Sequence, residues 1–449
     1  MFIYLKSINF EEVKLSLLLL KEYYSNYNEI SLNENKYLFH NIIDCMNKYS
    51  NEKIVLFYCL WILTNYIYYL KSKNEINNVL ISNNNFKLFE LIFSINDIYL
   101  ICLIIWLFQN LSDDNDEINY IIITSNLFKN QILNILQQDE LINHINDENN
   151  IYYDIIFQGF NLFYNLISIE YKNYEQNQLL EIKQIKILMI KILLKYIDTN
   201  ILKLYEIILN NIILFYDYIN DDSISTKIIS INLIDKILNK TNYFNNYSTL
   251  LLSNRVIGNY LSVNNINDIN LINKIFNFLF SNLKKLNNSI EMEIDTFWTL
   301  GNLIFCDEVI SNLLFTINGF IDLIINIFKE KSDKNLIREI LLILKEIICN
   351  INLDNFIVII NKGFFNELIN SLLRFENDEN LLIFIFQNIS FFIEKGDLIK
   401  KNTNNENIIL NKFNQNYGKE LLIKYEFSNN DILRELVNKI HNKFYIDKL

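Results

Sequence analysis

Apolar residues recur along the chain at intervals of three and four positions, the spacing that gathers side chains on one face of an α-helix. No segment keeps the strict alternation of apolar and polar residues that predicts a half-buried strand. Clusters of Asn, Asp and Ser separate the apolar stretches, for example at residues 82–85 and 112–116. The pattern predicts an all-α protein built from helices of roughly ten to fifteen residues.

The three Trp residues of the chain share one local pattern, in which each stands four positions before an Asn. The pairs are Trp61 with Asn65, Trp106 with Asn110, and Trp298 with Asn302. Residues four apart lie on the same face of a helix. A Trp and an Asn side by side on one face suit a packed core poorly and a peptide-binding surface well. The repeated pair therefore predicts such a surface.

The context of Asn65 recurs along the chain with a regular period. Its equivalents are Asn110, Asn165, Tyr218, Asn259, Asn302, Glu346 and Asn388. From Tyr218 onward the steps are 41, 43, 44 and 42 residues. The two steps before it, 55 and 53 residues, predict insertions at residues 139–150 and 171–178. A second anchor keeps the period, because Gly363 follows Gly319 by 44 residues in a similar apolar context.

A period of about 40 to 47 residues in an all-helical chain predicts armadillo or HEAT repeats. Such repeats stack into a solenoid, and one helix from each repeat lines its concave wall. We expect a right-handed superhelical solenoid of about nine to ten armadillo repeats. Its groove-bearing part is expected over residues 1–400, and a C-terminal capping repeat over residues 401–449.

The charge balance bears on the class of partner. The 449 residues carry 52 Asp plus Glu against 40 Lys plus Arg, a net charge of −12. A nucleic-acid binder needs a basic footprint, so direct binding of nucleic acid is not expected. The acidic balance favours basic partners instead.

Candidate chemistry for an enzyme is sparse. The five Cys, which we expect to be buried thiols, are Cys45, Cys59, Cys102, Cys306 and Cys349. The three His lie far apart, so no metal site is expected. There is no phosphate-binding Gly loop and no nucleophile motif, so we expect neither catalysis nor a cofactor. The apolar run 98–108 is too short for a bilayer, and residues 182–197 carry a stripe of lysines, including Lys186, that we expect to be solvated.

The repeats resemble the importin-α (karyopherin-α) family of nuclear import adaptors. Residues 60–65 and 105–114 are similar to its second and third armadillo repeats. Tyr218 falls where that family has Tyr in place of Asn, and Arg255 falls where it has Arg in place of Trp. Residues 416–445 resemble its closing helices. The resemblance covers nearly the whole chain.

The resemblance implies an adaptor that binds basic nuclear localisation peptides of cargo proteins and shuttles between nucleus and cytoplasm. Importin-β and an export receptor would be further partners; a membrane would not. Asn amides would bind the peptide backbone, Trp slots would hold Lys or Arg stems, and carboxylates would take the charged heads. The major groove would use Trp61, Asn65, Trp106, Asn110, Asp114 and Asn165. The minor groove would use Tyr218, Asp221, Arg255, Asn259, Asp295, Trp298, Asn302 and Glu339, with Arg255 in a structural ion pair.

Several positions depart from the family pattern. Asn161, Leu214 and Leu342 stand where Trp is expected, and Lys71 and Lys73 follow Asn65 where cations would repel a basic ligand. These departures favour an alternative, an armadillo scaffold whose cargo groove is eroded and which binds other protein partners. Residues 1–10 already resemble the first repeat, and the basic importin-β-binding segment of the family is not seen. We therefore expect a groove that is not autoinhibited.

Overall fold

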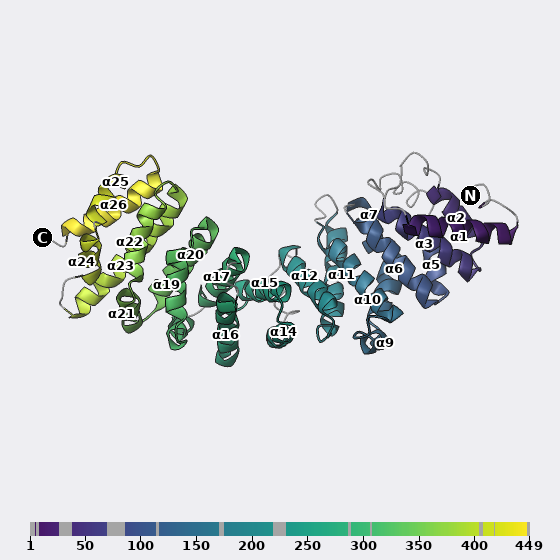
Figure 1. Ribbon diagram of the computed structural model, residues 1–449, viewed down its shortest axis with the longest axis horizontal. Helices are drawn as coiled ribbons and strands as arrows, with labels where there is room; N and C mark the ends of the chain where they lie inside the picture. The colour runs from purple at the N-terminus through teal and green to yellow at the C-terminus, as the bar shows by residue number, and fades with distance from the viewer. Residues whose placement is uncertain are drawn as a thin grey trace. The chain divides into compact units, whose positions relative to one another are not determined.

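In the computed structural model, every regular element of the described residues is a helix, so the predicted all-α class is confirmed (Figure 1). The structure describes residues 5, 9–26, 38–69, 86–113, 116–169, 175–218, 230–285, 289–305, 308–403, 407–416 and 418–446. The chain divides into two compact units, Met1–Ser230 and Ile231–Leu449. We call them unit 1 and unit 2.

Unit 1 is a stack of helices in which one helix of each repeat packs against its counterpart in the next. Its helices are α1 (Phe10–Asn26), α2 (Leu38–Lys48), α3 (Lys53–Tyr68), α5 (Phe86–Ser94), α6 (Ile98–Ser112), α7 (Asp116–Thr124), the π-helix η2 (Leu127–Ile132), α8 (Leu133–Leu136), α9 (Asp139–Asn143), α10 (Ile151–Ile167), α11 (Gln176–Lys195) and α12 (Leu202–Tyr218). The row α1, α3, α6, α10 and α12 runs through the unit, each member packed on the next (Figure 1). Helices α2, α5 and α11 pack against α3, α6 and α12.

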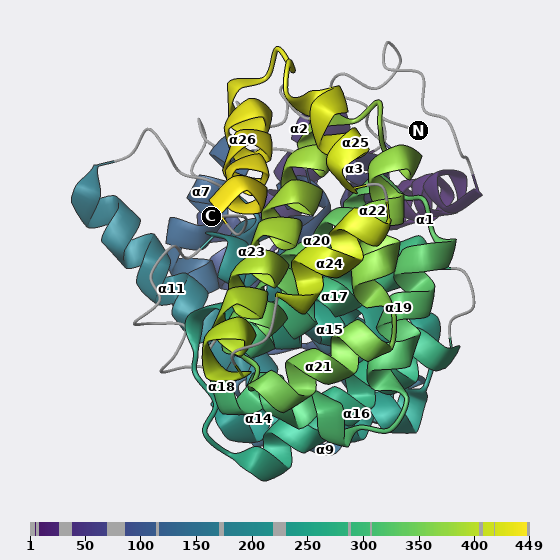
Figure 2. The same cartoon turned by 90° about the vertical axis from the view of Figure 1, so that its left-hand side faces the viewer.

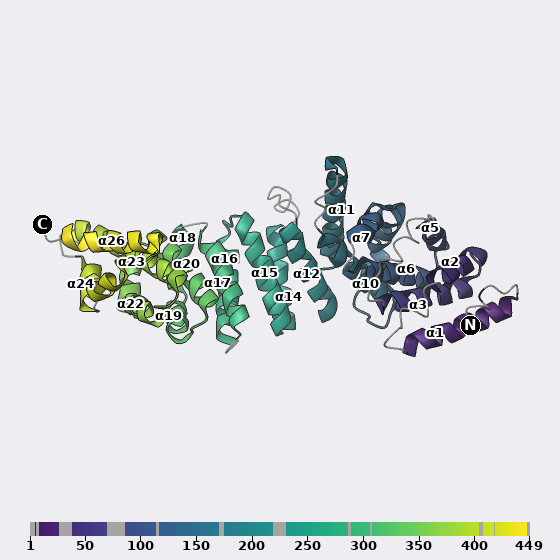
Figure 3. The ribbon, with the colours of Figure 1, turned by 90° about the horizontal axis from the view of Figure 1, so that it is seen from above.

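Unit 2 repeats the same arrangement. Its helices are α14 (Ile231–Phe244), α15 (Tyr247–Val263), α16 (Ile269–Lys285), α17 (Ile290–Phe305), α18 (Glu308–Leu313), the short 3₁₀-helix η3 (Leu314–Thr316), α19 (Phe320–Glu330), α20 (Lys334–Asn350), α21 (Leu353–Asn361), α22 (Phe364–Arg374), α23 (Glu379–Thr403), α24 (Ile408–Gln415), α25 (Gly418–Tyr425) and α26 (Asp431–Ile446). Helices α15, α17, α20 and α23 follow one another through the unit (Figure 3). Helix α26 lies beside α23 and completes the row (Figure 2).

The row helices of both units are called ladder helices below. Polar residues fix where several of them begin. Asp97 caps α6 by accepting hydrogen bonds from the amides of Tyr99 and Leu100, and Asp333 caps α20 in the same way. A carboxylate at this position satisfies amides that have no partner within the helix. Asp97 and Asp333 therefore mark where α6 and α20 begin.

The second sequence anchor marks one recurring backbone turn. Gly319 and Gly363 directly precede α19 and α22, with φ of +79° and +85°. L-residues with a side chain rarely adopt this left-handed conformation, whereas Gly does so at little cost. The 44-residue spacing of the two glycines is thus the spacing of one turn in consecutive repeats.

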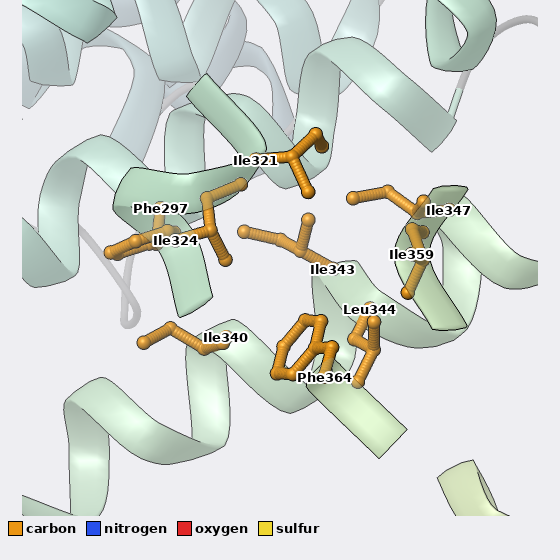
Figure 4. Close-up of a pocket in the computed structure, with 9 residues that line it drawn as sticks. All are labelled: Phe297, Ile321, Ile324, Ile340, Ile343, Leu344, Ile347, Ile359 and Phe364. Carbon is orange, nitrogen blue, oxygen red and sulfur yellow. The ribbon is translucent and has the colours of Figure 1, made fainter. Parts of the chain in front are cut away.

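The interior between the helix layers is apolar and closely packed. In unit 2, nine side chains from α17, α19, α20, α21 and α22 converge on a gap of only about 10 Å³, and all nine are hydrocarbon (Figure 4). A cavity of this size barely reaches the volume of one water probe, and its wall offers no polar partner. It is a packing gap of the apolar core and offers no room for a ligand.

The short helix α9 occupies the first predicted insertion, and the predicted boundary at residue 400 falls within α23. The expectation of a solvated Lys186 is wrong: it is buried and donates to the carbonyls of Ile167 (2.8 Å) and Ile169 (2.9 Å) at the end of α10. Within the described part of the chain no single helix could cross a membrane, although two bent pairs, in α18–α19 and α21–α22, meet the length and composition together.

Candidate peptide-binding surface

The first two Trp of the repeated pattern come together in unit 1. Trp61 of α3 and Trp106 of α6 meet edge to face, with ring centroids 6.0 Å apart and an interplanar angle of 87°. The indole Nε1 of Trp61 donates to Ser25 Oγ of α1 at 3.1 Å, which ties this ring to the preceding ladder helix. Both rings are half-buried. The two indole rings thus lie side by side across α3 and α6.

A lysine of the chain itself sits at this aromatic cluster. Lys21 Nζ of α1 lies 5.4 Å from the ring centroid of Trp61, 5.6 Å from that of Tyr58 and 5.9 Å from that of Phe57. Cations within about 6 Å of a ring centroid are attracted by its negative face. The rings therefore accommodate an ammonium group, and in this structure Lys21 provides it. This contact could not be predicted from the sequence, because it depends on how α1 packs on α3.

Two pattern asparagines of unit 1 each connect a ladder helix to its predecessor. Asn110 is buried, and its amide Nδ2 donates to the carbonyl of Thr64 in α3 at 3.0 Å. Asn165 donates to the carbonyl of Gln109 at 3.2 Å and to Ser112 Oγ at 2.8 Å, both in α6. An amide group carries two donor hydrogens and an acceptor oxygen, so half-buried Asn165 keeps capacity for a ligand. Asn110 is buried, and its amide serves to join α6 to α3.

The same inter-helix bond recurs at further positions. Asn302 donates to the carbonyl of Gly258 at 3.1 Å, and Asn388 to that of Leu341 at 3.0 Å. Asn211, which the sequence reading did not single out, donates to the carbonyl of Phe160 at 3.2 Å. Asn211 lies two turns before Tyr218. It was not recognised in the sequence because the repeat was aligned on Tyr218. Asn65 differs, because its amide bonds the carbonyl of Trp61 within its own helix at 2.9 Å.

Tyr218 ends α12 half-buried, with the Nζ of buried Lys186 5.7 Å from its ring centroid. Its ring thus has a cation neighbour already. Asp114 of the predicted major groove lies outside the described residues. The same holds for Asp221 of the predicted minor groove, and for Lys71 and Lys73.

The expected ion pair of Arg255 is present in unit 2. Its Nε lies 2.6 Å from Asp295 Oδ2 and its Nη2 lies 2.7 Å from Glu291 Oε1, so α15 and α17 are joined by charge. Burial raises the pKa of Asp295, and the Arg255 guanidinium only partly offsets this. Burial lowers the pKa of Arg255, but its two carboxylate partners outweigh that effect and the net shift is upward. Both pKa values therefore rise: burial outweighs the ion pair at Asp295, whose side chain is 17% exposed, and the ion pairs outweigh burial at Arg255, whose side chain is 36% exposed.

Carboxylates line the ladder helices of unit 2 on both sides of Trp298. On α17 the stripe runs Glu291, Asp295, Trp298 and Asn302, at spacings of one helical turn. On α20 it runs Glu339, Leu342 and Glu346. Burial raises the pKa of Glu339, and Glu346 pairs with its neighbour Lys345 at 3.4 Å. Asn259 of α15 is half-buried in the adjoining row. This face of unit 2 is acidic.

Trp298 packs on the backbone of the preceding ladder helix. A Cβ atom placed on Gly258 of α15 would come within 2.1 Å of Trp298 Cζ3, so only Gly leaves room for the ring. Gly258 directly precedes the anchor Asn259, and the whole chain has only seven Gly. A close helix contact at this position could therefore have been predicted from the sequence.

Metal-binding and redox groups are not concentrated on these faces. No cluster of three or more His, Cys, Asp or Glu in the described ranges could hold a metal ion. Cys45, Cys59 and Cys102 are buried as expected, whereas the same expectation for Cys349 is wrong. Cys349 is exposed because it continues the ladder stripe of Leu342 and Glu346 on α20. Cys306 lies outside the described residues.

No protein-family profile matches the sequence, and no curated protein matches it. Among solved structures, the chain is similar to one from work on a phosphorylation switch that controls the interaction between cadherin and beta-catenin. The TM-score is 0.61 at 12% identity, over 88% of this chain and 69% of that chain. A designed armadillo repeat protein aligns with a TM-score of 0.44 at 13% identity, over 56% of this chain and 97% of that one. The fold of the chain is therefore that of armadillo-repeat proteins, as the period of the sequence predicts.

Proposed function

We propose that the chain is a non-enzymatic adaptor that binds extended basic segments of partner proteins on its ladder helices. The observation that carries the proposal is the acidic stripe of unit 2, where Asp295 lies one turn before Trp298 on α17 and Glu339 lies on the neighbouring helix α20. A Trp face attracts a Lys or Arg head by about 0.5–2 kcal/mol, and the nearby carboxylates add charge-assisted hydrogen bonds. Asn259 and Asn302 stand beside this stripe with polar side chains that a peptide backbone can use.

The basic segments that we propose as ligands are nuclear localisation signals of cargo proteins, as the resemblance to importin-α implies. In this proposal the chain is an import adaptor that shuttles between nucleus and cytoplasm. Importin-β and an export receptor would be its transport partners. The similarity to a structure of the cadherin–beta-catenin interaction supports protein partners in general.

The two units do not support basic ligands equally. In unit 1 the rings of Trp61, Tyr58 and Phe57 already hold the Lys21 ammonium, and a basic peptide would have to displace it or begin at Trp106. In unit 2 the carboxylate of Glu339 on α20 favours a cation near Trp298, whereas Asp295 already pairs with Arg255. We therefore propose the ladder face of unit 2 as the stronger basic-peptide site.

A binding titration tests this proposal. A fluorescent Lys-rich monopartite peptide is titrated with the full chain and with Trp298→Ala, and binding is followed by anisotropy. We expect loss of the ring to weaken binding about tenfold, and Trp298→Phe to recover part of it. Phe427→Ala is the matched control, because Phe427 is an exposed aromatic residue in the loop between α25 and α26 and not on the stripe. Thermal unfolding of each variant identifies losses that come from misfolding.

Absence of binding by the intact chain would contradict the proposal, as would an equal effect of Trp298→Ala and Phe427→Ala. A second candidate is an armadillo scaffold for other proteins. Two observations favour it. The Asn110 amide bonds the Thr64 carbonyl of the preceding helix, and Leu342 stands on α20 where Trp is expected. A stable partner recovered with the chain, combined with no affinity for the basic peptide, would support that candidate.

A further inference from the structure

Unit 1 contains an open cavity of about 590 Å³ at the N-terminal ends of its ladder helices. Its wall includes Lys14 and Lys21 of α1, Lys53 and Ile54 of α3, and Asp97 and Tyr99 at the start of α6. We call it the lysine pocket. Its volume is within the range of roughly 300–1,000 Å³ that is usual for ligand sites. It lies on the same helix stripe as the tryptophans, because Ile54 and Trp61 are two turns apart on α3, as are Tyr99 and Trp106 on α6.

Positive charge dominates the lysine pocket. Asp97 is its one acidic lining residue within the described ranges, and this carboxylate is already committed. It caps α6 and pairs with Lys53 at 3.1 Å. No carboxylate of the described residues lies within ion-pair distance of Lys14 or Lys21. Two ammonium charges therefore face the pocket without a neutralising acid among these residues.

Two large apolar side chains of the pocket wall are exposed to solvent. Tyr99 is 57% exposed and Ile54 is 52% exposed, although both are large. Exposed apolar side chains beside a concave surface mark interaction sites more often than chance. Ammonium groups around an apolar wall fit a ligand that carries carboxylates next to an apolar or aromatic side chain.

We propose that the lysine pocket binds an acidic segment of a partner protein, with an apolar side chain of that segment seated against Ile54 and Tyr99. The inference goes beyond the proposed function, because that function assigns basic segments to the acidic stripe of unit 2. A peptide fits better than a nucleic acid, since the chain carries a net charge of −12 and only three lysines line the pocket. Complementary charge would speed association and make binding fall as salt rises.

The test uses the full chain and a fluorescent peptide of Asp and Glu residues around one Leu. We expect saturable binding that weakens about tenfold in Lys14→Glu, because a repulsive charge replaces an attractive one. Lys191→Glu on α11 is the matched control, because Lys191 is an exposed lysine of the same unit outside the pocket. Its effect is expected to stay below about twofold. Ile54→Ser is expected to weaken the Leu-containing peptide more than an all-acidic one.

Three results would overturn the inference: no preference for the acidic peptide over a neutral one, equal effects of Lys14→Glu and Lys191→Glu, or tighter binding of a single-stranded oligonucleotide of equal charge. Thermal unfolding of Lys14→Glu separates loss of binding from loss of fold. The outcome is independent of the proposed function, which is read with the basic peptide and Trp298→Ala in a parallel titration. Binding of the acidic peptide alone would leave this inference standing and remove the other.

Discussion

The ring of Trp298 lies so close over Gly258 that a Cβ atom at Gly258 would meet Trp298 Cζ3 at 2.1 Å and Cε3 at 2.7 Å. Cβ atoms do not approach other heavy atoms below 3.0 Å, so the ring keeps this position only while residue 258 is Gly. A Gly within a helix lowers helix stability by about 1 kcal/mol relative to Ala. Here Gly258 makes room for Trp298, the proposed peptide-binding residue, in its observed orientation.

Gly258→Ala is therefore expected to lower the free energy of unfolding by about 1–3 kcal/mol, despite its better helix propensity, because the interface is overpacked. Displacement of Trp298 should also change the Trp fluorescence of the folded protein. Gly301→Ala is the matched control on α17, since its Cβ would lie 3.3 Å from Ile343 Cγ1, a contact that a small shift relieves. Equal destabilisation by the two substitutions would contradict the packing described for Trp298.

Asn110 and Asn65 occupy equivalent sequence positions but differ in what their amides do. Asn110→Ala removes the buried bond to the Thr64 carbonyl and is expected to cost about 1–3 kcal/mol of stability. Asn65→Ala removes a bond within α3 at a half-buried site and should change stability by no more than about 0.5 kcal/mol. Urea denaturation of both variants measures the difference. If the Asn65 variant lost as much stability as the Asn110 variant, the assignment of a structural function to Asn110 would fail.

Binding of a basic peptide to unit 2 should depend on pH in a defined direction. Burial raises the pKa of Asp295 and of Glu339 in the free protein, so both carboxyls are protonated at a higher pH than usual. A bound Lys or Arg favours the charged form and lowers these pKa values, so binding releases protons. Affinity should rise as pH increases from about 4 through the raised pKa values, and then level off.

Anisotropy titrations across that pH range measure the effect, and calorimetry in two buffers of different ionisation enthalpy counts the released protons. Glu339→Gln should flatten the pH profile, whereas Glu330→Gln, at an exposed carboxylate of α19 outside the ladder, should leave it unchanged. A profile that Glu339→Gln does not alter would exclude Glu339 from the site.

Sequence patterns predicted what depends on one helix at a time. Helical periodicity gave the all-α class, and the repeat period gave the armadillo fold. An ion pair of Arg255 was expected, but its partners Asp295 and Glu291 on the next ladder helix were not predicted. Contacts between helices were harder to predict. Lys186 looked like part of a solvated stripe on α11, yet the end of α10 offers it two carbonyls that lack helical partners. The contact of Lys21 with the aromatic cluster was not predicted either, because the sequence alone does not show which residues of α1 face α3.

Photo-crosslinking tests the central claim most directly, namely that the acidic ladder stripe of unit 2 binds a basic segment. A Lys-rich peptide with one photoreactive residue is irradiated with the full chain, and the labelled positions are mapped by mass spectrometry. The account predicts labels on the stripes of α15, α17 and α20, around Arg255, Trp298 and Glu339, with competition by unlabelled basic peptide. Labels confined to α16, α19 and α22, which carry no part of the stripe, or labels that unlabelled peptide does not displace, would contradict it.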